Sequence, residues 1–123
     1  MSDCIFCKIV KREIPSYKIY EDDEFLGFLD VFPETEGHTL VIPKMHVEQV
    51  WDYPNLGKYF EVVGKVARSY RDKTGGKMVR LMIFGIDVPH AHIHLLPGKS
   101  NDLKGKKLDD KKLKEIERKF KVV

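Results

Sequence analysis

Histidine and apolar residues alternate in one short run near the end of the chain, His90-Ala91-His92-Ile93-His94. Successive side chains of a β-strand point to opposite faces, so the run predicts a strand with its apolar residues toward the core and its imidazoles on the other face. Because a strand rises about 3.3 Å per residue, neighbouring imidazoles should start about 6.6 Å apart and the outer two about 13 Å apart. One metal ion with ligand bonds of about 2 Å does not easily collect all three. The row therefore predicts separate roles for the three rings, or a groove that they line.

All five histidines lie either in this run or at His38 and His46. A neutral imidazole is a metal ligand or a nucleophile, it exchanges protons near neutral pH, and in its charged form it hydrogen-bonds to phosphate oxygens. The alternative, three solvated histidines on an exposed strand, is an improbable use of most of the histidines in one chain. The clustering therefore favours a chemical site.

Apolar periodicity and turn residues predict the other elements. A stripe at helical spacing marks one long helix and consists of Leu56, Phe60, Val63, Ala67 and Tyr70. Together the elements indicate a single α+β domain, with a five-stranded antiparallel sheet, a long helix and a C-terminal helix. The predicted helices cover residues 4–13, 54–74 and 108–120, and the predicted strands cover residues 18–21, 24–30, 38–43, 77–84 and 91–96.

The length of 123 residues suits one domain. No apolar run approaches the ~20 residues of a membrane helix, and the N-terminus lacks the pattern of a secretory signal, so we expect a cytoplasmic protein without membrane contact. We divide the chain into a core, residues 1–98, with net charge −2, and a basic loop and helix, residues 99–123, with net charge +5, packed on the same domain. A solvated face of mixed charge explains this tail better than an anionic partner, so nucleic acid is not expected to bind.

Two cysteines, Cys4 and Cys7, form a Cys-x-x-Cys pair close to the N-terminus. In a reducing cytosol a structural disulfide is not expected, and the spacing suits half of a zinc site or a redox pair. A thioredoxin-like motif would follow a strand and open a helix, and no strand precedes this pair. The position therefore favours metal over redox chemistry.

The run and its surroundings resemble the histidine triad (HIT) family, whose motif alternates three histidines with apolar residues, here His90 to Leu96 followed by Pro97. Further blocks match the family in the same order, so the resemblance covers about residues 3–97 and is specific. It implies a HIT-like fold. The matching blocks are Asp3–Ile9, Glu13–Pro15, Tyr20–Asp23, Phe28–Val31 and Gly37–His46.

The resemblance implies a hydrolase or transferase that acts at the α-phosphate of a purine nucleotide conjugate. His92 would attack phosphorus and form a nucleotidyl-histidine intermediate, from which water releases AMP or GMP. A nucleophilic imidazole must be neutral and held by its other ring nitrogen, and the family uses a backbone carbonyl near the first histidine, His90, for this. His94 would contact the phosphate, and His38 would support these residues from behind.

The resemblance also implies a nucleoside pocket. Ile5, Phe6, Ile9 and Leu40 would enclose the base, although each could equally be a plain core residue. Asp30 would accept hydrogen bonds from the ribose hydroxyls, which suits a carboxylate at the end of an apolar strand.

Related proteins imply a structural zinc ion held by Cys4, Cys7, His46 and His90. Two thiolates and two imidazoles saturate a tetrahedral zinc and leave no position for substrate. The alternative is two buried free thiols with a surface histidine. The family further implies a homodimer, formed through the helix of residues 54–74 and the adjacent edge strand.

The sequence departs from the family just before the triad. The family often places a glutamine after the glycine that corresponds to Gly85, and this chain has Ile86, followed by Asp87. We assign Asp87 to nucleotide binding, with the alternatives that it holds a histidine or protonates a leaving group. A phosphoramidase-like hydrolase is the preferred function. The alternatives are a dinucleoside polyphosphate hydrolase and a non-catalytic nucleotide-binding module.

Overall fold

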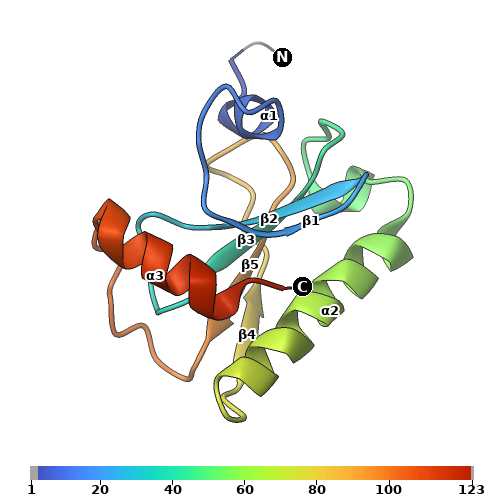
Figure 1. Cartoon of the computed structure of the whole chain (residues 1–123). Helices are drawn as coiled ribbons and strands as arrows, with labels where there is room; N and C mark the ends of the chain where they lie inside the picture. Colours follow the sequence, from blue (N-terminus) through green and yellow to red (C-terminus); the bar gives the residue numbers. More distant parts are fainter. Residues whose placement is uncertain (1–2, 123) are drawn as a thin grey trace.

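The computed structural model describes residues 3–122 of the chain. It contains three α-helices, a single 3-10 turn and five strands (Figure 1). In chain order they are α1 (Ile5–Val10), β1 (Lys18–Glu21), β2 (Phe25–Leu29), β3 (Thr39–Pro43), η1 (Val50–Asp52), α2 (Leu56–Lys73), β4 (Val79–Met82), β5 (Ile93–Pro97) and α3 (Asp110–Phe120).

The five strands pair antiparallel in the order β1-β2-β3-β5-β4, which confirms the predicted α+β fold (Figure 1). The larger hydrophobic core lies between this sheet and the helices α2 and α3. A second, smaller core lies on the opposite face, where α1 packs against β2 and β3. Because α1 has only six residues, it covers only part of that face.

Strand β5 divides its side chains between the two faces. Ile93 and Leu95 are buried in the larger core, whereas His94 pairs with Leu40 on the α1 side. The predicted start of this strand at residue 91 is wrong, because the chain reaches the sheet only at Ile93. His90 and His92 therefore precede the strand.

This correction changes the predicted row of imidazoles. The rings of His92 and His94 have their centroids 5.2 Å apart, closer than the 6.6 Å or so of neighbouring side chains on one strand face. All three histidines of the run are buried, so the exposed strand of solvated histidines is wrong as well. The backbone N–H of Ala91 donates to the carbonyl of Val47, which ties the segment to the loop after β3.

The long helix α2 is present, but its buried stripe differs from the predicted one. The predicted Val63 and Tyr70 are buried, whereas Phe60 is 36% exposed. The side chains that face the core are Tyr59, Val62, Val63, Val66 and Tyr70. The face is rotated because the hydroxyl of Tyr59 donates to the carbonyl of Val41 and anchors the helix to β3.

Helix α1 is shorter than predicted, since it begins at Ile5 and ends at Val10. Cys4 is its N-cap, and its Sγ accepts the backbone N–H of Cys7 at 3.4 Å. The first cysteine thus serves as a cap, which leaves its sulfur at the start of the helix beside Cys7. The predicted strand of residues 18–21 is confirmed with the same bounds as β1, and the other predicted elements are present with somewhat shorter bounds.

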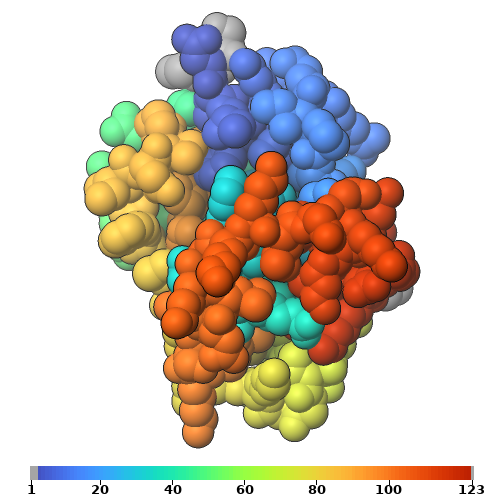
Figure 2. Space-filling view, turned by 90° about the vertical axis from the view of Figure 1, so that its left-hand side faces the viewer, coloured from blue at the N-terminus to red at the C-terminus, as the bar shows by residue number. Residues whose placement is uncertain are grey.

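The C-terminal segment packs on the domain. Backbone N–H groups of Leu103, Gly105 and Leu108 donate to carbonyls of the loop after β2, at residues 31–34. Figure 2 shows this orange segment lying across the cyan loop. Phe120 at the end of α3 contacts Tyr70 and the Cα of Gly37, whose φ of +88° requires glycine.

In the described residues, no helix is both long and apolar enough to cross a membrane. The cytoplasmic location stays a prediction from the sequence.

Candidate functional site

His92 lies at the centre of the candidate site. Its side chain is 1% exposed, and its Nδ1 lies 2.8 Å from the carbonyl oxygen of His90. A carbonyl accepts only, so Nδ1 carries the proton and Nε2 keeps its lone pair. Among the described residues Nε2 has no hydrogen-bond partner. The predicted backbone carbonyl at His90 is therefore in place, and it orients the imidazole of His92 through Nδ1.

His94 takes the opposite tautomer because of a hydrogen-bond relay behind it. The backbone N–H of Glu34 donates to Nδ1 of His38 at 3.0 Å, so the proton of His38 is on Nε2. This Nε2–H donates to Nδ1 of His94 at 2.9 Å. The proton of His94 is therefore on Nε2, which has no partner within the described chain. The site thus presents a lone pair on His92 beside an N–H donor on His94.

Burial keeps this relay uncharged at neutral pH. It lowers the pKa of His38 to about 4, with a smaller effect from the charge of Arg80. It also lowers the pKa of His94 to about 4, with smaller contributions from His38 and His92. The structure therefore brings together three of the predicted catalytic histidines, and His90 joins them through its carbonyl.

The predicted nucleoside residues lie next to the histidines, on the α1 side of the sheet. The ring of Phe6 packs edge-on against His92, with centroids 5.2 Å apart. Ile9 and Leu40 belong to the same small core, and Ile5 is largely exposed at its margin. Phe28, which the sequence analysis did not assign to the site, packs against Phe6 at 5.6 Å. Phe28 comes two residues before Asp30, and side chains two apart along a strand point to the same face. This alternation could have identified Phe28 from the sequence.

Asp30 adjoins the relay. Its Oδ1 accepts the backbone N–H of Phe32 at 2.8 Å, and its Oδ2 lies 3.7 Å from Nε2 of His38. Burial raises the pKa of this carboxyl group. A partly buried acceptor therefore lies between the small apolar core and the histidines.

Asp87 approaches the histidines from the opposite direction. Its Oδ1 lies 3.3 Å from Nε2 of His92, although the aspartate side chain is 62% exposed. Its neighbour Ile86 is 85% exposed. The loop of residues 83–89 thus places a carboxylate beside Nε2 of His92.

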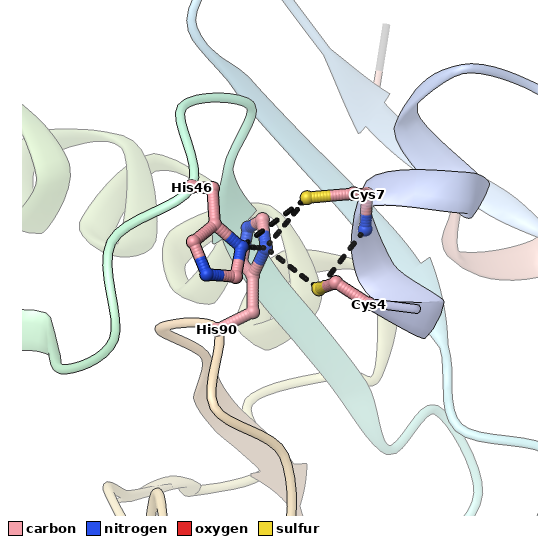
Figure 3. A group of neighbouring side chains, drawn as sticks. All are labelled: Cys4, Cys7, His46 and His90. Carbon is pink, nitrogen blue, oxygen red and sulfur yellow. Dashed lines mark hydrogen bonds between the residues drawn. The ribbon is translucent and has the colours of Figure 1, made fainter. Parts of the chain in front are cut away.

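The four predicted metal ligands converge on one point (Figure 3). Nδ1 of His90 lies 3.4 Å from Sγ of Cys4, 3.5 Å from Sγ of Cys7 and 3.2 Å from Nδ1 of His46. The Sγ of Cys7 and Nδ1 of His46 are also 3.2 Å apart. In a tetrahedral zinc site with bonds of about 2.0–2.3 Å, neighbouring ligand atoms are roughly 3.3–3.8 Å apart. The spacing of these four atoms fits such an ion.

The protonation of the ligands fits a metal as well. Nε2 of His90 donates to the carbonyl of Pro43 at 2.8 Å, which leaves Nδ1 with a lone pair toward the sulfurs. Burial also lowers the pKa of His90, which favours the neutral form. Burial and the neighbouring Cys4 raise the pKa of Cys7, so a thiolate there requires a compensating cation.

Asp30, His38 and His94 also lie close enough together to suggest a metal site. The relay argues against it, because Nε2 of His38 and Nδ1 of His94 already share a proton between them. We assign this group to the relay.

Comparisons with known proteins agree with this geometry. The HIT domain model matches residues 11–101. An uncharacterized HIT-like protein of Borreliella burgdorferi is 42% identical, over 96% of this chain and 91% of its own length. Adenosine 5'-monophosphoramidase HNT1 of Saccharomyces cerevisiae is 37% identical, over 76% of this chain and 61% of its own. Adenylylsulfatase HINT3 of Arabidopsis thaliana is 34% identical, over 82% of this chain and 55% of its own length.

Two solved structures extend the comparison. A Hit-like protein from Bartonella henselae superposes with a TM-score of 0.87 at 28% identity, covering 98% of this chain and 95% of its own. A Zn-bound histidine triad family protein from Mycobacterium smegmatis has a TM-score of 0.80 at 34% identity, covering 97% of this chain and 91% of its own. The five-stranded sheet and its helices are thus shared with solved structures of this kind.

The relay makes stability depend on pH. His38 and His94 have folded-state pKa values of about 4, below the ordinary 6.5, so the unfolded chain binds more protons between these values. Their contribution is complete above pH 6.5 and is lost as the pH falls toward 4. Each histidine adds a slope of up to about 1.4 kcal/mol per pH unit. We expect the free energy of unfolding, measured by urea denaturation, to decrease from pH 7 to pH 6 and again to pH 5.

In His38→Gln this slope should flatten, since one titrating imidazole is gone. The comparison of the two proteins cancels any loss of metal, which both share. Equal slopes in wild type and variant would contradict the buried neutral relay.

Proposed function

Because the chain belongs to the HIT domain family, whose similar members include nucleotide hydrolases, we propose that it hydrolyses nucleotide conjugates through a covalent intermediate on His92. One observation carries this proposal. Nε2 of His92 is buried, is oriented through the carbonyl of His90 and makes no hydrogen bond within the described residues, while the Asp87 carboxylate lies 3.3 Å away. A held, neutral imidazole with an available lone pair is a nucleophile rather than a structural group.

The proposed reaction has two displacements at the α-phosphorus. Nε2 of His92 forms a bond to phosphorus, and the bond to the leaving amine breaks with its electron pair on nitrogen, which takes up a proton from solvent. Water then attacks phosphorus and gives up a proton to solvent, the bond to Nε2 breaks with its electron pair on Nε2, and AMP or GMP leaves. Throughout, Nε2–H of His94 donates to a phosphate oxygen, where a buried donor stabilises developing charge most strongly.

We further propose that the small core beside the site binds the nucleoside. Phe6 contacts His92 directly, and Ile5, Ile9 and Leu40 extend the apolar surface away from it. The free side of Asp30 would accept the ribose hydroxyls. Residues 1–98 would form the histidine triad domain proper, with residues 99–123 as an addition to it.

We propose zinc as the metal of the Cys4, Cys7, His46 and His90 site. The ligand spacing supports it, as does the Zn-bound structure from Mycobacterium smegmatis. Bound there, the ion would be fully ligated and structural. Its effect on the reaction would pass through His90, whose ring faces the metal ligands and whose carbonyl holds His92.

A homodimer would cover the exposed edge of the sheet. β4 pairs only with β5, so its other edge is open within the described chain. Apolar side chains are exposed on this strand and just after it, and on α2. Open edges of this kind are pairing surfaces. The residues concerned are Phe60, Met78, Leu81, Met82 and Phe84.

We expect the protein to release AMP from adenosine phosphoramidates, and His92→Ala to reduce kcat/KM by about 1000-fold or more, since no other group replaces the nucleophile. His94→Ala should cost about 100-fold, the usual effect of one donor to a developing negative charge. Release of AMP is followed by chromatography, and a diadenosine polyphosphate in the same series reads out the alternative hydrolase activity. A wild type no faster than His92→Ala on every conjugate would leave only the non-catalytic binding module.

The purified protein should contain about one zinc per chain, and Cys4→Ser should lose it, because three ligands hold zinc more weakly than four. A chelator should lower the Tm of the wild type but not that of the variant, which already lacks the ion. Metal analysis and thermal unfolding measure both effects without reference to activity. A metal-free wild type with an intact fold would defeat the assignment.

The protein should sediment at twice its mass of 14.3 kDa at micromolar concentration. Leu81→Lys should shift it to the monomer, since a buried lysine at the paired edge is costly. Met45→Lys is a matched control, because Met45 is equally exposed but lies in the loop after β3. If Leu81→Lys leaves the mass unchanged, the dimer does not use this edge.

A further inference from the structure

Carboxylates gather around a cavity next to the start of α1, beside the candidate site. Asp87 lies 3.3 Å from Nε2 of His92 and also lines a cavity of about 730 Å³. Asp3 and Glu48, from two other segments, line the same cavity. None of the described residues that line it is lysine or arginine. Of the three carboxylates, none forms an ion pair with a lysine or arginine in the described chain.

The second observation is the orphaned nitrogen itself. Nε2 of His92 belongs to a side chain that is 1% exposed, it makes no hydrogen bond within the described residues, and the Asp87 carboxylate lies 3.3 Å from it. A phosphorus atom that reaches Nε2 must push this carboxylate outward. The carboxylate of Asp87 then lies on the side of phosphorus opposite Nε2. In an in-line displacement the leaving atom departs from phosphorus on that side.

Charge decides which leaving groups suit this position. A sulfate or phosphate leaving group brings negative charge toward Asp87, and within the described residues neither Asp87 nor Glu48 is paired with a lysine or arginine. Ile86, the neighbour of Asp87, has no side-chain donor for an oxyanion. At a few ångströms and near-surface dielectric, each such repulsion changes a rate on the order of 10-fold. An amine instead offers N–H donors to the carboxylate, and a cationic amine is attracted.

We propose that Asp87, supported by Glu48, is the specificity-determining residue that selects conjugates with amine leaving groups and rejects those with anionic leaving groups. This inference rests on the proposed function and deepens it. It favours a nucleoside phosphoramidate, above all one of a positively charged amine, over an adenylyl sulfate or a polyphosphate.

The test measures kcat/KM for three conjugates of AMP. They carry ammonia, 1,2-diaminoethane or sulfate as the leaving group. In Asp87→Asn the ratio of the sulfate to the ammonia conjugate should rise about 10-fold relative to wild type, and the advantage of the diamine conjugate should disappear. Glu48→Gln should shift the ratios in the same direction by about 2- to 3-fold, because of the two carboxylates only Asp87 lies within 4 Å of a ring nitrogen of His92.

Asp72→Asn, at the C-terminal end of α2, is the matched control and should leave every ratio unchanged. If Asp87 only supports the loop structurally, all conjugates lose rate together and the ratios stay constant. Ratios within twofold of wild type in Asp87→Asn would overturn the proposal.

Binding separates this inference from the proposed function. Calorimetry of intact conjugates with His92→Ala should show the diamine conjugate bound more tightly than the sulfate, and the additional Asp87→Asn change should remove most of the difference. If the wild type releases no AMP from any conjugate, the proposed function fails, and the binding series still decides the role of Asp87. Equal affinities for the conjugates, with and without Asp87, would overturn it.

Discussion

His90 connects the three parts on which the site depends. Its Nε2–H donates to the carbonyl of Pro43 at the end of β3, and its Nδ1 faces Cys4, Cys7 and His46. Its own carbonyl accepts a hydrogen bond from Nδ1–H of His92. A change in the position of this fully buried ring therefore moves the acceptor that fixes the tautomer of the nucleophile. The N-terminal helix joins the same arrangement through the two sulfurs and through the ring of Phe6, which packs against His90 and His92 and holds this short helix close to the site.

The second constraint is desolvation. Three neighbouring imidazoles at His38, His92 and His94 would repel one another if charged, and burial already lowers the pKa of His38 and His94. A neutral imidazole has one donor and one acceptor nitrogen. The hydrogen-bond partner of each ring decides which of its two nitrogens carries the proton. A backbone N–H at Glu34 makes His94 a donor, while a backbone carbonyl at His90 makes His92 an acceptor. Two chemically identical rings thereby take complementary roles, His92 through a main-chain carbonyl and His94 through a main-chain N–H that acts by way of the His38 ring.

The sequence predicted much of this because its strongest pattern is local. Alternation in β5 correctly placed Ile93 in the core and His94 on the opposite face, since strand geometry depends on nearest neighbours. It failed at His90 and His92, where hydrogen bonds to the loops, and not sheet pairing, hold the backbone. No local pattern indicates where a strand begins when its partner strand is fifty residues away. The stripe of α2 failed for a similar reason, because the Tyr59 hydroxyl selects the buried face through a carbonyl on another element.

The two sides of the nucleophile are built differently, and this difference bears on function. Behind His92 stand a strand, a helix and the metal ligands, and almost every polar atom there has a partner fixed by the fold. In front of it stands one loop, in which Ile86 and Asp87 are exposed and bear little of the core packing. A substitution behind the ring disturbs the fold and the chemistry together, whereas a substitution in the loop changes only what the leaving group meets. We therefore expect selectivity for the leaving group to vary within this fold while His92 stays the same, and Asp87, 3.3 Å from Nε2, is the residue that we propose to set it in this chain.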